Sequence, residues 1–208
     1  KEKMDYSKDS STALYYCNAL TIVECIFNNI EPSNKHFRGG AIRFKNEQGN
    51  CTIYGTIFNN CSTKGDGGAI FVCGKEYNSG DNMTHLMANY FNSSYCCYSK
   101  CSAKITNVEN SKSGYGSAML ISAKNIDLYY SSSNECPKGV DEQVYGAQFD
   151  LQSNVVKSSF INATSGNSKY CAAIEYRNAK SGFFCYQTIV DQIGGFVTSF
   201  TNLFGPVN

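Results

Sequence analysis

Cysteines are the first residues with possible chemistry in this chain of 208 residues, which contains eleven of them, more than is typical of a cytosolic protein. They are Cys17, Cys25, Cys51, Cys61, Cys73, Cys96, Cys97, Cys101, Cys136, Cys171 and Cys185. No Cys-x-x-Cys pair occurs, so the ligand spacing of a zinc site is missing. The number of cysteines favours structural disulfides made outside the cytosol, and the odd count leaves at least one thiol without a partner in the chain. The close group Cys96, Cys97 and Cys101 has two interpretations, a reactive or metal site and loop disulfides, and we favour the second.

The carboxylates are the second group with possible chemistry. An enzyme that cleaves carbohydrate needs two or three of them on one face, as acid and base or around calcium. The candidates here are Asp127, Asp150, Glu175 and Asp191, and none lies in a dense acidic motif. Asp150 and Glu175 stand three and two residues after the alanines of two repeat units, so we expect them on opposite faces of their strands. The sequence therefore predicts no catalytic residue, no metal and no cofactor.

Two other residue types suggest surface roles. Five Asn-x-Ser/Thr sequons support a secretory route and are glycosylation candidates: Asn50, Asn60, Asn82, Asn92 and Asn162. The tyrosine pairs Tyr15–Tyr16 and Tyr129–Tyr130 would place one ring inward and one outward on a strand, the outward ring being available to a sugar or a protein. His36 and His85 lie in polar surroundings, and we expect both to be solvated.

Composition excludes several partners. Eighteen basic residues oppose 17 acidic ones without a basic block, so nucleic acid and anionic membranes are poor partners. No apolar run reaches the length of a membrane span. The chain begins Lys1-Glu2-Lys3-Met4, which we interpret as a processed chain or a segment of a larger protein.

A repeated motif must position all of these residues. Its clearest copies are Gly39-Gly40-Ala41-Ile42 and Gly67-Gly68-Ala69-Ile70, and weaker ones follow. The marker alanines stand at 13, 41, 69, 118, 147 and 173. Their steps are 28, 28, 49, 29 and 26 residues, and we read the long step as two periods with one marker lost. A period of this size indicates a repeat architecture.

A second marker, Phe-x-Asn, closes the units at Phe27–Asn29, Phe58–Asn60 and Phe160–Asn162. Short alternating runs such as Thr52–Phe58 have strand periodicity, and no run has helical periodicity. The asparagine can take the left-handed backbone conformation of a tight corner. The sequence thus predicts an all-β fold, a right-handed parallel β-helix of about seven to eight coils over a single domain, residues 1–208.

These paired motifs resemble the repeats of the chlamydial polymorphic outer membrane proteins and of large surface proteins of parasitic protists. The resemblance is sharpest over residues 27–72. It departs in the second motif, since the bacterial repeat reads Phe-x-x-Asn. The resemblance implies a β-helical surface or adhesin-like domain with no catalytic residues to carry over.

We therefore expect a non-catalytic structural or adhesive module at the cell surface that binds protein or glycan. Loops projecting at residues 74–85 and 131–144 would be suited to binding. One alternative is a filament or coat subunit that self-associates through the ends of the β-helix. A polysaccharide lyase or hydrolase on the same fold is the other.

Overall fold

The chain is described by a computed structural model at residues 5–7, 13–15, 17–32, 38–79, 82–104, 115–136, 146–164, 171–177, 181–190 and 198–201. Every regular element in these ranges is a β-strand, and the main sheet is built from parallel pairs. The predicted all-β parallel β-helix is therefore confirmed. The described residues include no helix of the length and hydrophobicity that crossing a membrane requires.

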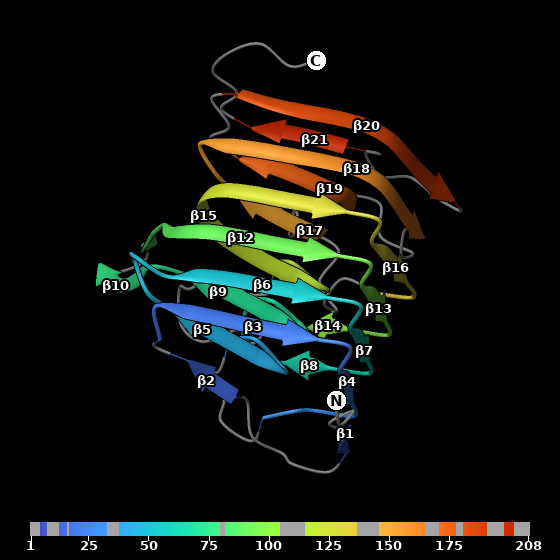
Figure 1. The fold of residues 1–208 in the computed structure, drawn as a ribbon, viewed down its shortest axis with the longest axis horizontal. Coiled ribbons are helices and arrows are strands. Elements are labelled where there is room, and N and C mark those ends of the chain that lie inside the picture. The colour runs from blue at the N-terminus through green and yellow to red at the C-terminus, as the bar shows by residue number, and fades with distance from the viewer. Residues whose placement is uncertain are drawn as a thin grey trace.

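Three walls run along the solenoid (Figure 1). The rear wall is a succession of seven paired strands: β2 (Ala13–Tyr15), β5 (Ile42–Lys45), β9 (Ile70–Cys73), the start of β15 (Met119–Tyr129), β17 (Gly146–Gln152), β19 (Cys171–Arg177) and β21 (Thr198–Thr201). Each strand of this ladder marks one rung of the stack.

The front wall lies opposite and contains β3 (Ala19–Val23), β6 (Asn50–Tyr54), β12 (Ala88–Ser94), the rest of β15, β18 (Val155–Thr164) and β20 (Ser181–Val190). A short wall follows it, made of β1 (Asp5–Ser7), β4 (Ile26–Asn28), β7 (Ile57–Asn59), β13 (Cys97–Ser99), β16 (Ser132–Asn134) and the end of β18. Front strands run left to right and rear strands return as the chain climbs, which is a right-handed coil (Figure 1).

The long step between Ala69 and Ala118 is a single coil and not two. Strand β9 pairs directly with β15, through Ile70 with Met119, so no rung lies between them. The extra length includes an antiparallel hairpin of β10 (Lys75–Ser79) and β11 (Asn82–Leu86), which projects beside the stack (Figure 1). The prediction of a lost marker was wrong because an insertion lengthens a coil without adding a rung. The predicted projecting loop at 74–85 is this hairpin.

The glycine pair of the repeat has two separate causes. Gly39 and Gly67 take positive φ angles of 73° and 69°, which side-chain-bearing residues rarely adopt. Gly68 has an ordinary φ, but a Cβ there would collide with the carbonyl oxygen of Ser117 on the next rung. The alanine that follows is buried in the core at each described copy. Backbone conformation and close packing between rungs therefore explain the Gly-Gly-Ala motif that the sequence repeats.

Aromatic residues fill the core behind the short wall. Phe27 and Phe58 stack with ring centroids 5.0 Å apart, and Phe58 and Tyr98 stack at 5.1 Å. Parallel pairing in register brings the same position of each coil into contact, so the rings form a continuous column. A second small parallel pair, β8 (Ser62–Thr63) with β14 (Ser102–Ala103), continues two coils beyond the short wall.

Candidate functional site

At each end of the short wall the chain turns a corner, and one residue of that corner has a left-handed backbone conformation. The first corner, between the front and short walls, uses Glu24, Gly55, Tyr95, Tyr130 and Phe160, with φ between 47° and 57°. The second corner, beyond the short wall, uses Asn29, Asn60, Lys100 and Glu135, with φ between 49° and 56°. Asparagine and glycine adopt this conformation at low cost, whereas bulky residues do not.

The Phe-x-Asn prediction holds for two of its three copies. Asn29 and Asn60 are the left-handed residues of the second corner, and Asn60 Nδ2 donates to Asn29 Oδ1 at 2.8 Å. At Phe160–Asn162 the prediction was wrong. Phe160 is itself the left-handed residue, and Asn162 lies in β18 opposite Ser132. The third match is therefore displaced along the coil relative to the first two.

The residue after a corner points inward and carries a hydroxyl or thiol in seven of the nine cases. These residues are Cys25, Thr56, Cys96 and Ser131 at the first corner, and Cys61, Cys101 and Cys136 at the second. Each donates to the carbonyl oxygen two residues earlier, at 3.0 to 3.6 Å. Cysteine at these positions makes the same side-chain hydrogen bond as serine or threonine, in a more apolar setting. The five-residue spacing of Cys96 and Cys101, and of Ser131 and Cys136, was a signal that the sequence analysis missed.

The disulfide prediction is corrected by this geometry. None of the nine cysteines with described side chains is in a disulfide, and seven of these are buried. The corner thiols are directed to backbone carbonyls of their own and the preceding coil, as Cys101 Sγ is to Ser99 and Phe58. Cys51 and Cys73 lie buried in the walls, and Cys17 and Cys97 are exposed. The side chains of Cys171 and Cys185 lie outside the described residues.

Four of the buried thiols have raised pKa values. Burial raises the pKa of Cys51, Cys96 and Cys101 above the ordinary value of a thiol. The pKa of Cys136 is raised well above that value, first by its contact with the Cys101 thiol and then by burial. The thiolate is the nucleophile and metal ligand, so raising the pKa suppresses both kinds of chemistry. Among the described residues no group of three or more His, Cys, Asp or Glu side chains could hold a metal ion.

The candidate carboxylates do not converge on one site. Asp127 faces outward on the front wall, where its Oδ2 accepts a hydrogen bond from Tyr90 Oη at 2.7 Å. Asp150 is buried on β17 of the rear wall. Asp150 and Glu175 are in register, so the prediction that they alternate to opposite faces was wrong; Ala147 pairs with Ala172, not Ala173. The side chain of Glu175 and all of Asp191 lie outside the described residues.

A small hydrogen-bond network surrounds Tyr90 on the front wall. Ser94 Oγ donates to Asn92 Oδ1 at 2.8 Å, and Asn92 Nδ2 donates to Tyr90 Oη at 3.4 Å. Burial, followed by the hydrogen bond to Asp127, raises the pKa of Tyr90. Its hydroxyl therefore stays protonated at neutral pH and donates to the carboxylate. These hydrogen bonds join side chains of two neighbouring rungs, those of β12 and β15.

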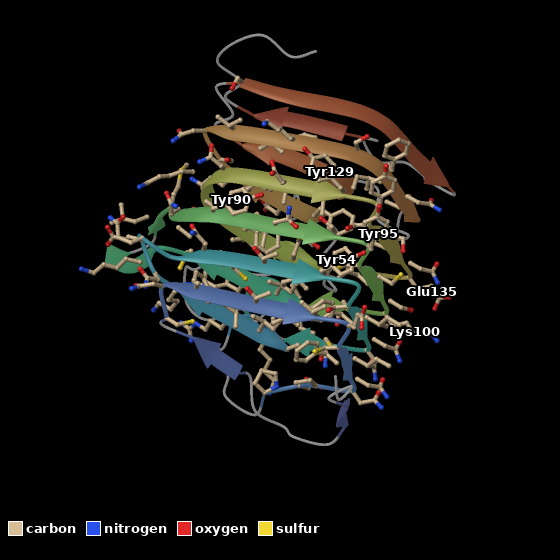
Figure 2. All side chains as sticks on the ribbon, in the orientation of Figure 1. Tyr54, Tyr90, Tyr95, Lys100, Tyr129 and Glu135 are labelled. Atoms are coloured by element: carbon tan, nitrogen blue, oxygen red, sulfur yellow. The ribbon has the colours of Figure 1, made fainter. Side chains whose placement is uncertain are left out.

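The first corner carries an exposed apolar stripe, which we call the corner ridge. Seven large hydrophobic side chains are exposed among the described residues, at 39 to 52%. Six of them form this ridge: Val23, Tyr54, Ile57, Tyr95, Tyr130 and Phe160. The seventh, Leu86, is on the hairpin. Figure 2 shows Tyr54 and Tyr95 at the end of the front wall, beside the short wall.

The ridge is ordered by its own ring contacts. Tyr95 and Tyr130 stack at 4.7 Å with ring planes 4° apart, and Tyr130 stacks on Phe160 at 4.5 Å and 5°. Tyr54 meets Tyr95 edge-on at 5.3 Å. The prediction that one of Tyr129 and Tyr130 points inward was wrong, because the left-handed turn at Tyr130 interrupts the alternation and leaves both rings outside. The stacked faces of Tyr95, Tyr130 and Phe160 cover one another, so this part of the ridge presents ring edges and the hydroxyls of Tyr95 and Tyr130.

The remaining surface predictions divide by residue. Asn50, Asn60 and Asn162 are exposed, and Asn92 is half-buried. The amide nitrogens of Asn60 and Asn92 are engaged in the hydrogen bonds given above, which makes Asn50 and Asn162 the better glycosylation candidates. The side chains of Asn82 and His85, and all of Tyr16 and His36, lie outside the described residues. The predicted loop at 131–144 begins later than expected, since β16 occupies residues 132–134.

The sequence matches no protein-family model, and no curated protein or solved structure is significantly similar to it.

Proposed function

We propose that this chain is a non-catalytic β-solenoid module of a surface structural or adhesive protein, and that it contacts its partner along the corner ridge. The observation that carries this proposal is the concentration of exposed hydrophobic side chains on one edge of the stack. Contiguous exposed apolar surface commonly marks a protein interaction site. Tyrosine is also enriched among residues that dominate binding energy.

Backbone strain supports a role for these rings beyond folding. Tyr95, Tyr130 and Phe160 occupy left-handed positions. The equivalent residue is Gly55 on another rung of the first corner, and it is asparagine on two rungs of the second corner. A bulky residue in this conformation costs about 1–3 kcal/mol. Ring stacking offsets a part of this cost, about 0.5–1.5 kcal/mol for each pair. Bulky side chains that are exposed despite the backbone strain of their positions are consistent with a binding surface.

A surface location is part of the same proposal and depends on the sequons, since none of the described cysteines is in a disulfide that would require an oxidising compartment. The alternative of a carbohydrate-cleaving enzyme gains no support from the described carboxylates, because Asp127 and Asp150 belong to opposite walls. A binding module needs only the fold and its exposed edge.

The test is a comparison of three proteins as fluorescent, streptavidin-linked tetramers on a glycan array and on cultured cells. The wild-type chain and a Leu86→Asn control should bind one of these surfaces alike. The double variant Tyr95→Asn/Tyr130→Asn should bind at least tenfold less. It keeps the backbone preference of the corner, so circular dichroism should show an intact fold. Equal binding by all three proteins, or cleavage of a polysaccharide by the wild type, would reject the proposal.

A further inference from the structure

Two tyrosines of the corner ridge are held face to face by the backbone as well as by their rings. Tyr95 and Tyr130 are equivalent positions of neighbouring rungs, because the register of β12 with β15 pairs Ser94 with Tyr129. The backbone nitrogen of Tyr95 donates to the carbonyl oxygen of Tyr129 at 3.1 Å, and Tyr95 and Tyr130 both have a left-handed backbone. Neighbouring strands of a sheet are about 4.8 Å apart. The ring centroids are 4.7 Å apart, so the rings keep the spacing that the strands impose.

Both phenols of this pair are open to solvent. Tyr95 is 52% exposed and Tyr130 is 46% exposed, and neither hydroxyl forms a hydrogen bond with a described residue. Other described tyrosines differ in this respect. Tyr90 donates its hydroxyl to a carboxylate, and the buried Tyr98 and Tyr176 share theirs with serine hydroxyls. The stacked pair therefore combines ring contact with two accessible phenolic hydroxyls.

We propose that Tyr95 and Tyr130 form a dityrosine cross-link within the chain when it is oxidised by hydrogen peroxide and a haem peroxidase. Each tyrosine gives up one electron and its phenolic proton, which an exposed hydroxyl can release directly to water. The two phenoxyl radicals couple through the ring carbons next to their oxygens, and these carbons then lose their hydrogens as the phenols re-form. One C–C bond replaces two C–H bonds, and the two electrons and two protons reduce one peroxide molecule to two water molecules.

Ring geometry selects this pair among the tyrosines of the ridge. The planes of Tyr95 and Tyr130 are 4° apart, so a carbon beside each phenolic oxygen lies close to the partner ring. Tyr54 meets Tyr95 edge-on, with ring planes 61° apart, which brings these carbons together less well. Phe160 stacks on the other face of Tyr130, but it has no phenolic hydroxyl and forms no phenoxyl radical. This modification does not depend on what the ridge binds.

The test is oxidation of the whole chain by hydrogen peroxide and a haem peroxidase, after alkylation of its exposed thiols. Tyr95 and Tyr130 lie in different tryptic peptides, residues 76–100 and 125–138. Tandem mass spectrometry should find these peptides linked, with two hydrogens fewer than their sum, in the monomeric product. The yield should not depend on protein concentration. In urea, where the rungs separate, the yield should fall at least tenfold.

Conservative variants assign the bond to its two residues. Tyr95→Phe and Tyr130→Phe remove only the phenolic hydroxyl, and Phe160 shows that this corner accepts phenylalanine. Each variant should lose the linked peptides at least tenfold, whereas the controls Tyr54→Phe and Tyr129→Phe should retain them. Four results would each overturn the inference: no linked peptides from the native wild type, an equal yield in urea, linked peptides that survive Tyr95→Phe or Tyr130→Phe, or cross-links found only in covalent dimers.

Discussion

Asn60 donates a hydrogen bond from its side-chain amide to the side-chain oxygen of Asn29, one coil away at 2.8 Å, while both residues hold a left-handed backbone. One residue type thus provides both the turn within a coil and a link between coils. Polar ladders of this kind run parallel to the stacking direction. Asn59 and Asn28 form a second one at 2.8 Å.

Asn60→Ala should lower the free energy of unfolding by about 1–2 kcal/mol, because alanine bears the steric cost of a left-handed backbone without the local side-chain hydrogen bonds that let asparagine adopt it. Asn60→Gly removes the same hydrogen bond but accepts the backbone conformation, so it should cost less. Denaturant unfolding of the two variants separates the contributions. A glycine variant that is as unstable as the alanine variant would show that the ladder and not the turn is what matters.

Phe58→Ala should be among the most destabilising single changes. Phe58 is fully buried between the rings of Phe27 and Tyr98. Truncating a buried phenylalanine costs about 3–5 kcal/mol, because the neighbouring coils cannot collapse into the space. The thermal midpoint should fall accordingly, and Phe58→Leu should retain most of the stability. A small effect of the alanine variant would mean that the coils stack mainly through their backbones.

The buried ion pair of Arg38 and Asp66 connects two rungs and supports a third. Arg38 Nε lies 2.8 Å from Asp66 Oδ2, and Asp66 Oδ1 accepts a hydrogen bond from the backbone of Tyr115 at 3.0 Å. Asp66→Ala should lower the free energy of unfolding by about 3–5 kcal/mol, because it removes the carboxylate paired with the buried guanidinium of Arg38. Asp66→Asn keeps an acceptor for Tyr115 and should cost less. Chemical denaturation measures both, and equal losses would assign the whole effect to charge.

The free energy of unfolding should fall above about pH 9. The pKa values of Cys51, Cys96, Cys101 and Cys136 are raised in the folded chain, so these thiols keep their protons where the unfolded chain releases them. The unfolded state then binds fewer protons, and each thiol lowers stability by about 1.4 kcal/mol per pH unit. Their contribution is complete below the ordinary thiol pKa and is lost as pH rises towards the folded values.

Unfolding in urea at pH 7 to 10.5, under reducing conditions, measures this slope. The variant Cys96→Ser should reduce the slope by one thiol, since Ser131 already occupies the equivalent corner position on the next rung. An exposed-thiol variant, Cys97→Ser, is the matched control for removing one thiol from the chain. Stability that is independent of pH over this range would mean that the thiols ionise within the folded chain.

The repeats determined the architecture because stacking demands the same residue type at the same place in each coil. Gly-Gly-Ala and the apolar alternation were enough to place the rear and front walls and to predict a parallel solenoid. They gave the wrong number of coils between Ala69 and Ala118, because spacing along the chain cannot distinguish a degenerate repeat from an insertion. Only the pairing of Ile70 with Met119 resolves this.

The chemistry of single residues was decided by tertiary structure. Composition alone gave cysteines a role in disulfides, whereas the corners direct their thiols inward to backbone carbonyls. Alternation placed one of Tyr129 and Tyr130 inside, whereas a left-handed turn put both outside and aligned Tyr130 with Tyr95 and Phe160. The sequence by itself determined which residues repeat and therefore the fold. Where each coil turns depends on a single backbone angle, and that angle, which no periodicity encodes, decided which side chains reach the surface.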